Sequence, residues 1–99
     1  NDNMAAGALE VVKNKPAYKN ILAYGVDGTA EAALLIKNGQ LTATSFQNAY
    51  ELAVKNLDTV NKLLTGKAKQ IDIDIECPLI TKDNVDMLIQ VHKKAGALK

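Results

Sequence analysis

Four helical patterns alternate with three strand patterns along the 99 residues, and this order limits the fold more than any other feature. Apolar residues at helical spacing predict helices over residues 3–14, 30–38 and 48–65, and a last helix that is capped by Asp83 or Asn84 and ends near residue 95. Strands are expected over residues 21–26, 41–47 and 70–77. Because strands separated by helices favour parallel pairing, the sequence predicts an α/β fold whose parallel sheet is covered on both faces.

Two of the expected strands differ in character. Residues 21–26 are almost wholly apolar, which is typical of a central parallel strand buried on both faces. Residues 70–77 alternate isoleucine with acidic residues, which predicts a strand with one solvated face and with Cys77 as a small buried hydrophobe. Alternate carboxylates on one strand face lie about 6.5–7 Å apart, too far for all three to chelate one ion, so no metal site is expected.

Composition excludes several classes of function. The chain has 12 Lys, no Arg and 11 acidic residues, so its near-neutral charge makes it a poor nucleic-acid binder. No apolar run approaches the roughly 20 residues that span a bilayer. The segment Gly25–Gly28 matches neither a dinucleotide fingerprint nor a phosphate loop, and no nucleophile, base and orienting group can be assembled. We therefore expect no cofactor and no enzymatic activity, and we expect His92 to be packed or hydrogen-bonded on its helix.

Three polar residues fall where ligands bind in open α/β sheets, at or near the carboxyl ends of strands and at a helix start. They are Asn1, Asp27 and Gln47. Each also has an ordinary structural explanation, because Asn1 could cap a helix, Asp27 could form a turn and Gln47 could be a solvated strand end. A carboxylate and two amides offer several donors and acceptors, which suits a polyhydroxylated ligand better than a reaction.

Four segments in register resemble the carboxyl-terminal third of ribose/galactose-type periplasmic sugar-binding proteins, the type 1 solute receptors of ABC importers; they are residues 1–8, 24–29, 42–48 and 78–85. The resemblance covers almost the whole chain. It implies a two-lobed protein with a sugar held between doubly wound α/β lobes, of which only the carboxyl-terminal part is present. The abrupt start at Asn1 fits the expectation that the amino-terminal portion is missing.

The resemblance also assigns roles along the chain. Asn1, Asp27 and Gln47 would hydrogen-bond sugar hydroxyls, as half of a site that the missing portion completes. Residues 1–47 would belong to the second lobe, residues 48–76 would form a crossover segment whose helix docks on the first lobe, and residues 77–99 would return to the second lobe. The implied partners are a sugar or polyol and a membrane permease or chemoreceptor. The implied location is the periplasm or the cell surface, with export as a lipoprotein left open.

Two other classes share this fold. One is the effector domain of a sugar-responsive transcription regulator, which usually shows a Pro-Leu-Thr-Thr-like stretch where this chain has Thr44 to Asn48. The other is the sensing domain of a membrane receptor. Because Gln47 ends the second strand, the sequence favours the transport receptor over the regulator.

Overall fold

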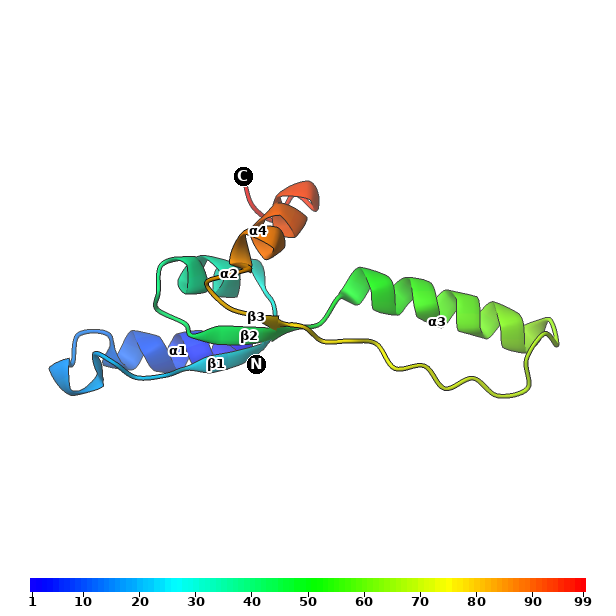
Figure 1. Ribbon diagram of the computed structural model, residues 1–99, viewed down its shortest axis with the longest axis horizontal. Helices are drawn as coiled ribbons and strands as arrows, with labels where there is room; N and C mark the ends of the chain where they lie inside the picture. The colour runs from blue at the N-terminus through cyan, green and yellow to red at the C-terminus, as the bar shows by residue number, and fades with distance from the viewer. The chain divides into compact units, whose positions relative to one another are not determined.

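The computed structural model describes all 99 residues and divides them into two compact units. The first unit contains residues 1–47 and 78–99, and the second contains residues 48–77. Figure 1 shows the elements of both units along the chain. None of the helices combines the length and the hydropathy that a membrane crossing requires.

The first unit holds three helices, one short 3₁₀ turn and three strands. In chain order they are α1 (Asp2–Val12), η1 (Pro16–Tyr18), β1 (Tyr24–Asp27), α2 (Ala30–Lys37), β2 (Ala43–Phe46), β3 (Leu79–Ile80) and α4 (Val85–Lys94). Local signals explain several boundaries: Thr29 caps α2 by accepting a hydrogen bond from the Ala32 amide, and Gly39 follows the helix at a φ of 75°. The predicted helices of this unit and its first two strands are confirmed, with bounds that differ by up to a few residues.

The sheet has the order β1-β2-β3, and it is only partly parallel. β1 and β2 run parallel, as predicted, with Tyr24 opposite Ala43 and Asp27 opposite Phe46. β3 runs antiparallel to β2. The chain leaves the sheet after Gln47, at the carboxyl end of β2, and returns at Pro78 to the same end. There the Phe46 amide donates to the Pro78 carbonyl over 2.9 Å. A chain that comes back at the same end of a strand from which it left must run antiparallel to that strand. The predicted α/β fold with a parallel sheet is thus confirmed, and β3 is an antiparallel strand added to the parallel pair.

The predicted strand over residues 70–77 is also wrong. These residues form no strand; they belong to the second unit, and the third strand is the short β3 that follows Pro78. Alternation describes which side chains avoid water, whereas a strand also needs a hydrogen-bonded neighbour, and none lies beside this segment. Cys77 is exposed rather than buried for the same reason.

The second unit consists of α3 (Ala49–Leu64) and the segment that follows it. Asn48 caps α3 by accepting a hydrogen bond from the Glu51 amide over 3.2 Å, and Gly66 follows the helix at a φ of 70°. No residue of α3 is buried, and the apolar stripe that predicted the helix is largely exposed, with Leu57 at 73% and Leu64 at 82%. The helix is therefore amphipathic without a covered apolar face.

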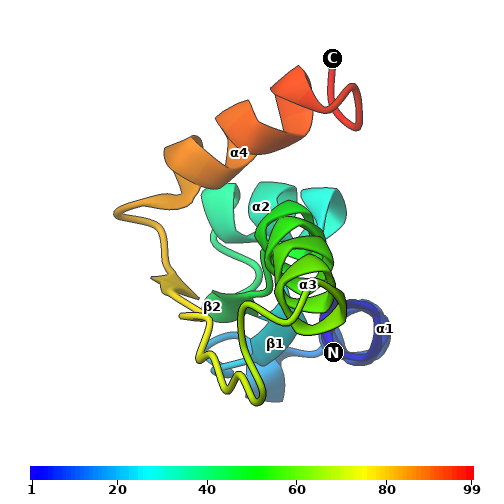
Figure 2. The same cartoon turned by 90° about the vertical axis from the view of Figure 1, so that its right-hand side faces the viewer.

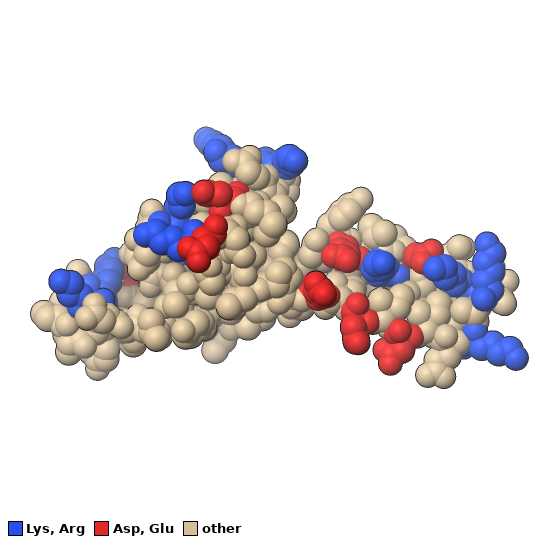
Figure 3. Space-filling model, in the orientation of Figure 1, with Lys and Arg blue, Asp and Glu red and all other residues tan.

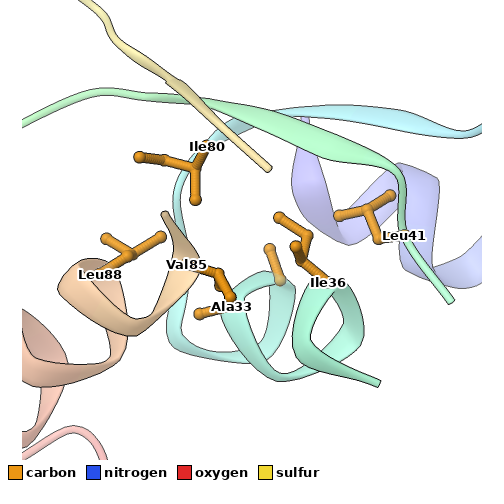
Figure 4. Packing of buried hydrophobic residues seen from close by; sticks show 7 residues of the cluster. Ala33, Ile36, Leu41, Ile80, Val85 and Leu88 are labelled. Atoms are coloured by element: carbon orange, nitrogen blue, oxygen red, sulfur yellow. The ribbon is translucent and has the colours of Figure 1, made fainter. Parts of the chain in front are cut away.

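The core of the first unit is small and is built mainly by α2, α4 and β3 (Figure 4). Its buried side chains are those of Ala32, Ala33, Ile36, Leu41, Ile80, Val85 and Leu88. α2 and α4 lie over one face of the sheet, while α1 lies alongside β1 (Figures 1 and 2). α1 reaches the same face of the sheet, because Asp2 contacts Gly25 on β1 and Thr44 on β2.

The opposite face of the sheet carries exposed apolar side chains. Tyr24, Val26 and Leu79 share this face, with 60%, 41% and 58% of their surface exposed. Ile21 and Leu22, which precede β1, are exposed as well. The prediction that residues 21–26 are buried on both faces is therefore wrong for this chain, because its own helices cover one face only.

Charged side chains on the first unit occupy several small separate groups on the face drawn in Figure 3, and one of these groups mixes both signs. Lys37 of α2 donates to both carboxylate oxygens of Asp86 on α4, over 2.7 and 2.9 Å. This ion pair joins the two core helices at the surface, where such pairs contribute at most about 1 kcal/mol.

Candidate functional site

The turn after β1 has an unusual backbone. β1 ends at Asp27, whose φ is 123°, and Gly28 follows at a φ of 75°. Asp27 is the one residue other than glycine with a positive φ. Such a conformation costs a residue with a side chain about 1–3 kcal/mol, and it persists only where the surrounding structure holds it. Strain of this kind is typical of functional sites.

A buried carboxylate holds the turn from one side. Asp2, at the start of α1, accepts a hydrogen bond from the Thr29 amide at Oδ2 over 2.7 Å and another from the Thr44 hydroxyl at Oδ1 over 2.6 Å. The Thr44 oxygen in turn accepts a hydrogen bond from the Gly28 amide over 3.3 Å. Asp2 and Thr44 are both almost completely buried. Residues from α1 and β2 thus fix two successive amides of the turn.

Two further contacts hold the carbonyl groups of the turn. The Gln47 amide donates to the Asp27 carbonyl over 3.0 Å, and His92 Nε2 lies 2.8 Å from the Gly28 carbonyl. The sequence predicts a packed or hydrogen-bonded histidine on the last helix, and this contact confirms it. α4 is thereby linked to the turn as well.

Two glycines allow these close approaches. A Cβ built on Gly25 would collide with the Asp2 carboxylate, and one built on Gly28 would collide with the Phe46 ring. The Gly-Val-Asp-Gly sequence is therefore explained by packing around the turn, in addition to the positive φ at its second glycine.

The structure brings Asp27 and Gln47 together through their backbone hydrogen bond. Asn1 lies next to Asp2, which bonds to Thr29 two residues after Asp27. The side chains of Asp27 and Gln47 make no hydrogen bond or ion pair within the chain, and Asp27 is partly buried. Asn1 uses its Oδ1 atom to cap α1 by accepting from the Met4 amide over 3.0 Å, which leaves its Nδ2 donors for another partner.

The arrangement suits binding rather than catalysis. Asp27 offers an acceptor carboxylate at the carboxyl end of β1, Gln47 offers an amide just after β2, and Asn1 offers an amide at the start of α1. The carboxyl ends of strands are where open α/β sheets bind ligands. Nowhere does the chain gather three or more residues able to ligate a metal ion.

Sequence reasoning missed two residues of this site. Asp2 and Thr44 are not among the residues that the sequence predicts for the site, because their buried contact joins segments that lie 42 residues apart. A polar threonine within a strand that is otherwise packed was the available signal. The Asn-Asp pair at the start of α1 was the other.

Replacing Asp27 by glycine is expected to raise the free energy of unfolding by about 1 kcal/mol, because glycine adopts a positive φ without strain. Urea unfolding followed by circular dichroism measures the change. Asn38→Gly is the matched control: Asn38 has a φ of −81°, so glycine there relieves no strain and should lower stability by up to about 1 kcal/mol. If the Asp27→Gly protein were less stable than the unaltered protein, the backbone at Asp27 would not be strained.

The chain was compared with known protein families and proteins. The family described as periplasmic binding protein domain matches residues 1–68. A xylitol-binding protein of Mycolicibacterium smegmatis is 32% identical over 90 residues, and the ribose import binding protein RbsB of Escherichia coli is 29% identical over 82 residues. These alignments cover 91% and 83% of this chain.

A solved structure has the same arrangement of elements. The crystal structure of a twin-arginine translocation pathway signal protein from Burkholderia phytofirmans matches 98% of this chain with a TM-score of 0.76 and 26% identity, over 32% of that protein. The chain spans 26% and 27% of the lengths of the xylitol-binding and ribose-binding relatives. The matched family and the shared fold lead to one conclusion: the chain belongs to the periplasmic binding protein family, in its type 1 class.

Proposed function

We propose that this chain is the carboxyl-terminal part of the solute receptor of an ABC importer, and that the receptor binds a sugar or polyol between two lobes. Asn1, Asp27 and Gln47 would form this chain's half of the site. The relatives include a xylitol-binding protein and a binding protein of ribose import, which supports a small polyhydroxylated ligand. Like those receptors, the protein would bind its ligand without converting it.

One observation carries the proposal: Asp27 presents an unpaired carboxylate from a strained and tightly held turn. A carboxylate that accepts two hydroxyl hydrogens forms charge-assisted bonds, which are stronger than neutral ones. Gln47 and Asn1 both donate and accept, so they match hydroxyl groups of either orientation. A turn that is already fixed loses little conformational freedom when ligand binds.

The second unit supports the two-lobed arrangement. In the proposal, residues 48–76 cross to the first lobe, where α3 docks, while residues 77–99 return to the second lobe. The exposed stripe of α3, including Leu57 and Leu64, is the kind of surface that such docking would cover. The exposed sheet face of Tyr24, Val26 and Leu79 would likewise pack against the amino-terminal portion of the receptor.

The closed form of the receptor would then deliver the ligand to a membrane permease or signal through a chemoreceptor. Ligand favours closure by its differential affinity for the closed state. Such a receptor would act in the periplasm or at the cell surface, including as an exported lipoprotein.

Asp27→Ala in the complete receptor is expected to weaken ligand binding by tenfold or more, because the substitution removes the charged acceptor. Isothermal titration calorimetry with D-ribose, xylitol and a panel of pentoses and hexoses measures the affinity. Asp83→Ala, which removes an exposed carboxylate elsewhere on the same unit, is the matched control and should leave the affinity unchanged. An unchanged affinity in the Asp27→Ala receptor would exclude Asp27 from the site, and a receptor that binds no member of the panel would exclude the ligand class.

A further inference from the structure

Asp2 is the buried acidic residue of the first unit, and sugar recognition as proposed does not use it. Only 1% of its surface is exposed, and it forms no ion pair. An isolated buried carboxylate is costly unless hydrogen bonds satisfy it. Two bonds do so here, and both come from the neighbourhood of the Asp27 turn. The position of Asp2 therefore suggests that its carboxylate has a role in holding that turn.

The hydrogen bonds of Asp2 have a defined direction. A carboxylate only accepts, so the Thr44 hydroxyl must donate its single hydrogen to Asp2 Oδ1 over 2.6 Å. The lone pairs of the Thr44 oxygen then remain for the Gly28 amide at 3.3 Å. Asp2 therefore fixes the polarity of the contact between Thr44 and Gly28, as well as holding the Thr29 amide directly.

These contacts enclose the strained residue. The amides of Gly28 and Thr29 follow Asp27 immediately. The first donates to the Thr44 hydroxyl and the second to the Asp2 carboxylate, and Thr44 and Asp2 are bonded to each other. The unfavourable φ of Asp27 needs such support from its surroundings. Without it, the turn would relax toward a conformation with negative φ and redirect the carboxylate.

We infer that Asp2 and Thr44 are positioning residues, which hold the 27–29 turn so that the Asp27 carboxylate is aimed at the ligand. This inference rests on the proposed role of Asp27. Neither residue needs to touch the ligand. Their contribution is to order the binding turn before ligand arrives, which reduces the entropy lost on binding.

The sharpest test compares two substitutions at Thr44 in the complete receptor. Thr44→Val keeps the shape but removes the hydroxyl, so the Gly28 amide and the Asp2 carboxylate each lose a partner. Thr44→Ser keeps the hydroxyl. We expect Thr44→Val to weaken binding of D-ribose or xylitol by about tenfold and Thr44→Ser to change it by less than about threefold, as measured by calorimetry. Ile36→Val, which trims the core without contacting the turn, controls for a general loss of stability.

Asp2→Asn tests the direction of the bonds. An asparagine that accepts from the Thr29 amide through its oxygen must point its NH₂ group at Thr44, so the threonine oxygen no longer serves the Gly28 amide alone. Amide hydrogen exchange, measured by NMR without ligand, should be at least tenfold faster at Gly28 and Thr29 in this variant. Exchange at Ile36, a buried residue of α2 whose amide lies farther along the helix than the first turn, serves as the internal reference. Unchanged exchange at both turn amides would overturn the inference.

A double substitution separates this inference from the proposed function. If Thr44 acts through Asp27, then Thr44→Val should cause little further loss of affinity in an Asp27→Ala receptor, whereas independent effects would add. Additive losses would overturn the positioning role while leaving Asp27 in the site. If Asp27→Ala alone has no effect on affinity, the proposed function fails instead, and the exchange experiment still decides whether Asp2 orders the turn.

Discussion

Gly25→Ala is expected to lower the free energy of unfolding by about 2–4 kcal/mol, one of the two largest effects of a single substitution that we predict. The added Cβ collides with the carboxylate of Asp2, which is buried and bonded on both oxygens. Overpacking of a buried site costs about 1–3 kcal/mol, and displacing Asp2 adds the cost of unsatisfied buried groups. Urea unfolding of the variant measures the loss.

Gly7→Ala provides the matched control. Gly7 lies within α1, and a Cβ there meets no atom within 4 Å. Because alanine is the better helix former, this substitution should stabilise the protein by about 0.5–1 kcal/mol. Glycine-to-alanine substitution is thus expected to lower the free energy of unfolding at Gly25 and to raise it at Gly7. A Gly25→Ala protein as stable as the Gly7→Ala protein would contradict the close contact between β1 and Asp2.

Leu88→Ala is expected to cost about 2–5 kcal/mol, because it opens a cavity in a core that only a few side chains fill. Leu88 is completely buried where α4 meets α2 and β3 (Figure 4). Such a loss is a large fraction of the stability of a small domain. Thermal unfolding followed by circular dichroism measures it.

Met87→Ala is the neighbouring control on the same helix. Half of the Met87 side chain is exposed, so its truncation should change stability by about 0.5 kcal/mol or less. Equal losses at the two positions would mean that α4 does not pack on the core as described.

The sequence predicted the parts of the fold that depend on local chemistry. Thr29 and Gly39 mark the two ends of α2, and Asn48 and Gly66 mark the two ends of α3. Capping and positive φ are properties of a few neighbouring residues, so they can be predicted from local sequence. The turn at Asp27 was predicted for a similar reason, since a polar residue follows an apolar run and precedes a glycine.

The remaining features depend on distant segments. The alternation over residues 70–77 predicts a strand, yet no other strand of this chain reaches it, so Cys77 is exposed. β3 forms instead because Pro78 returns to the edge of β2. The pairing of Asp2 with Thr44 depends on α1 and β2 meeting across Gly25, a contact that no local pattern indicates.

The antiparallel pairing of β2 and β3 has a consequence for the second unit. In topological terms, residues 48–77 are the loop of a very long β-hairpin, whose two ends are tied by the bond between Phe46 and Pro78. The entropy needed to close such a loop grows only with the logarithm of its length. The first unit can therefore tolerate a large excursion of the chain at this point. If Gln47 binds the ligand as proposed, the ligand contacts the chain at the point where it leaves the first unit.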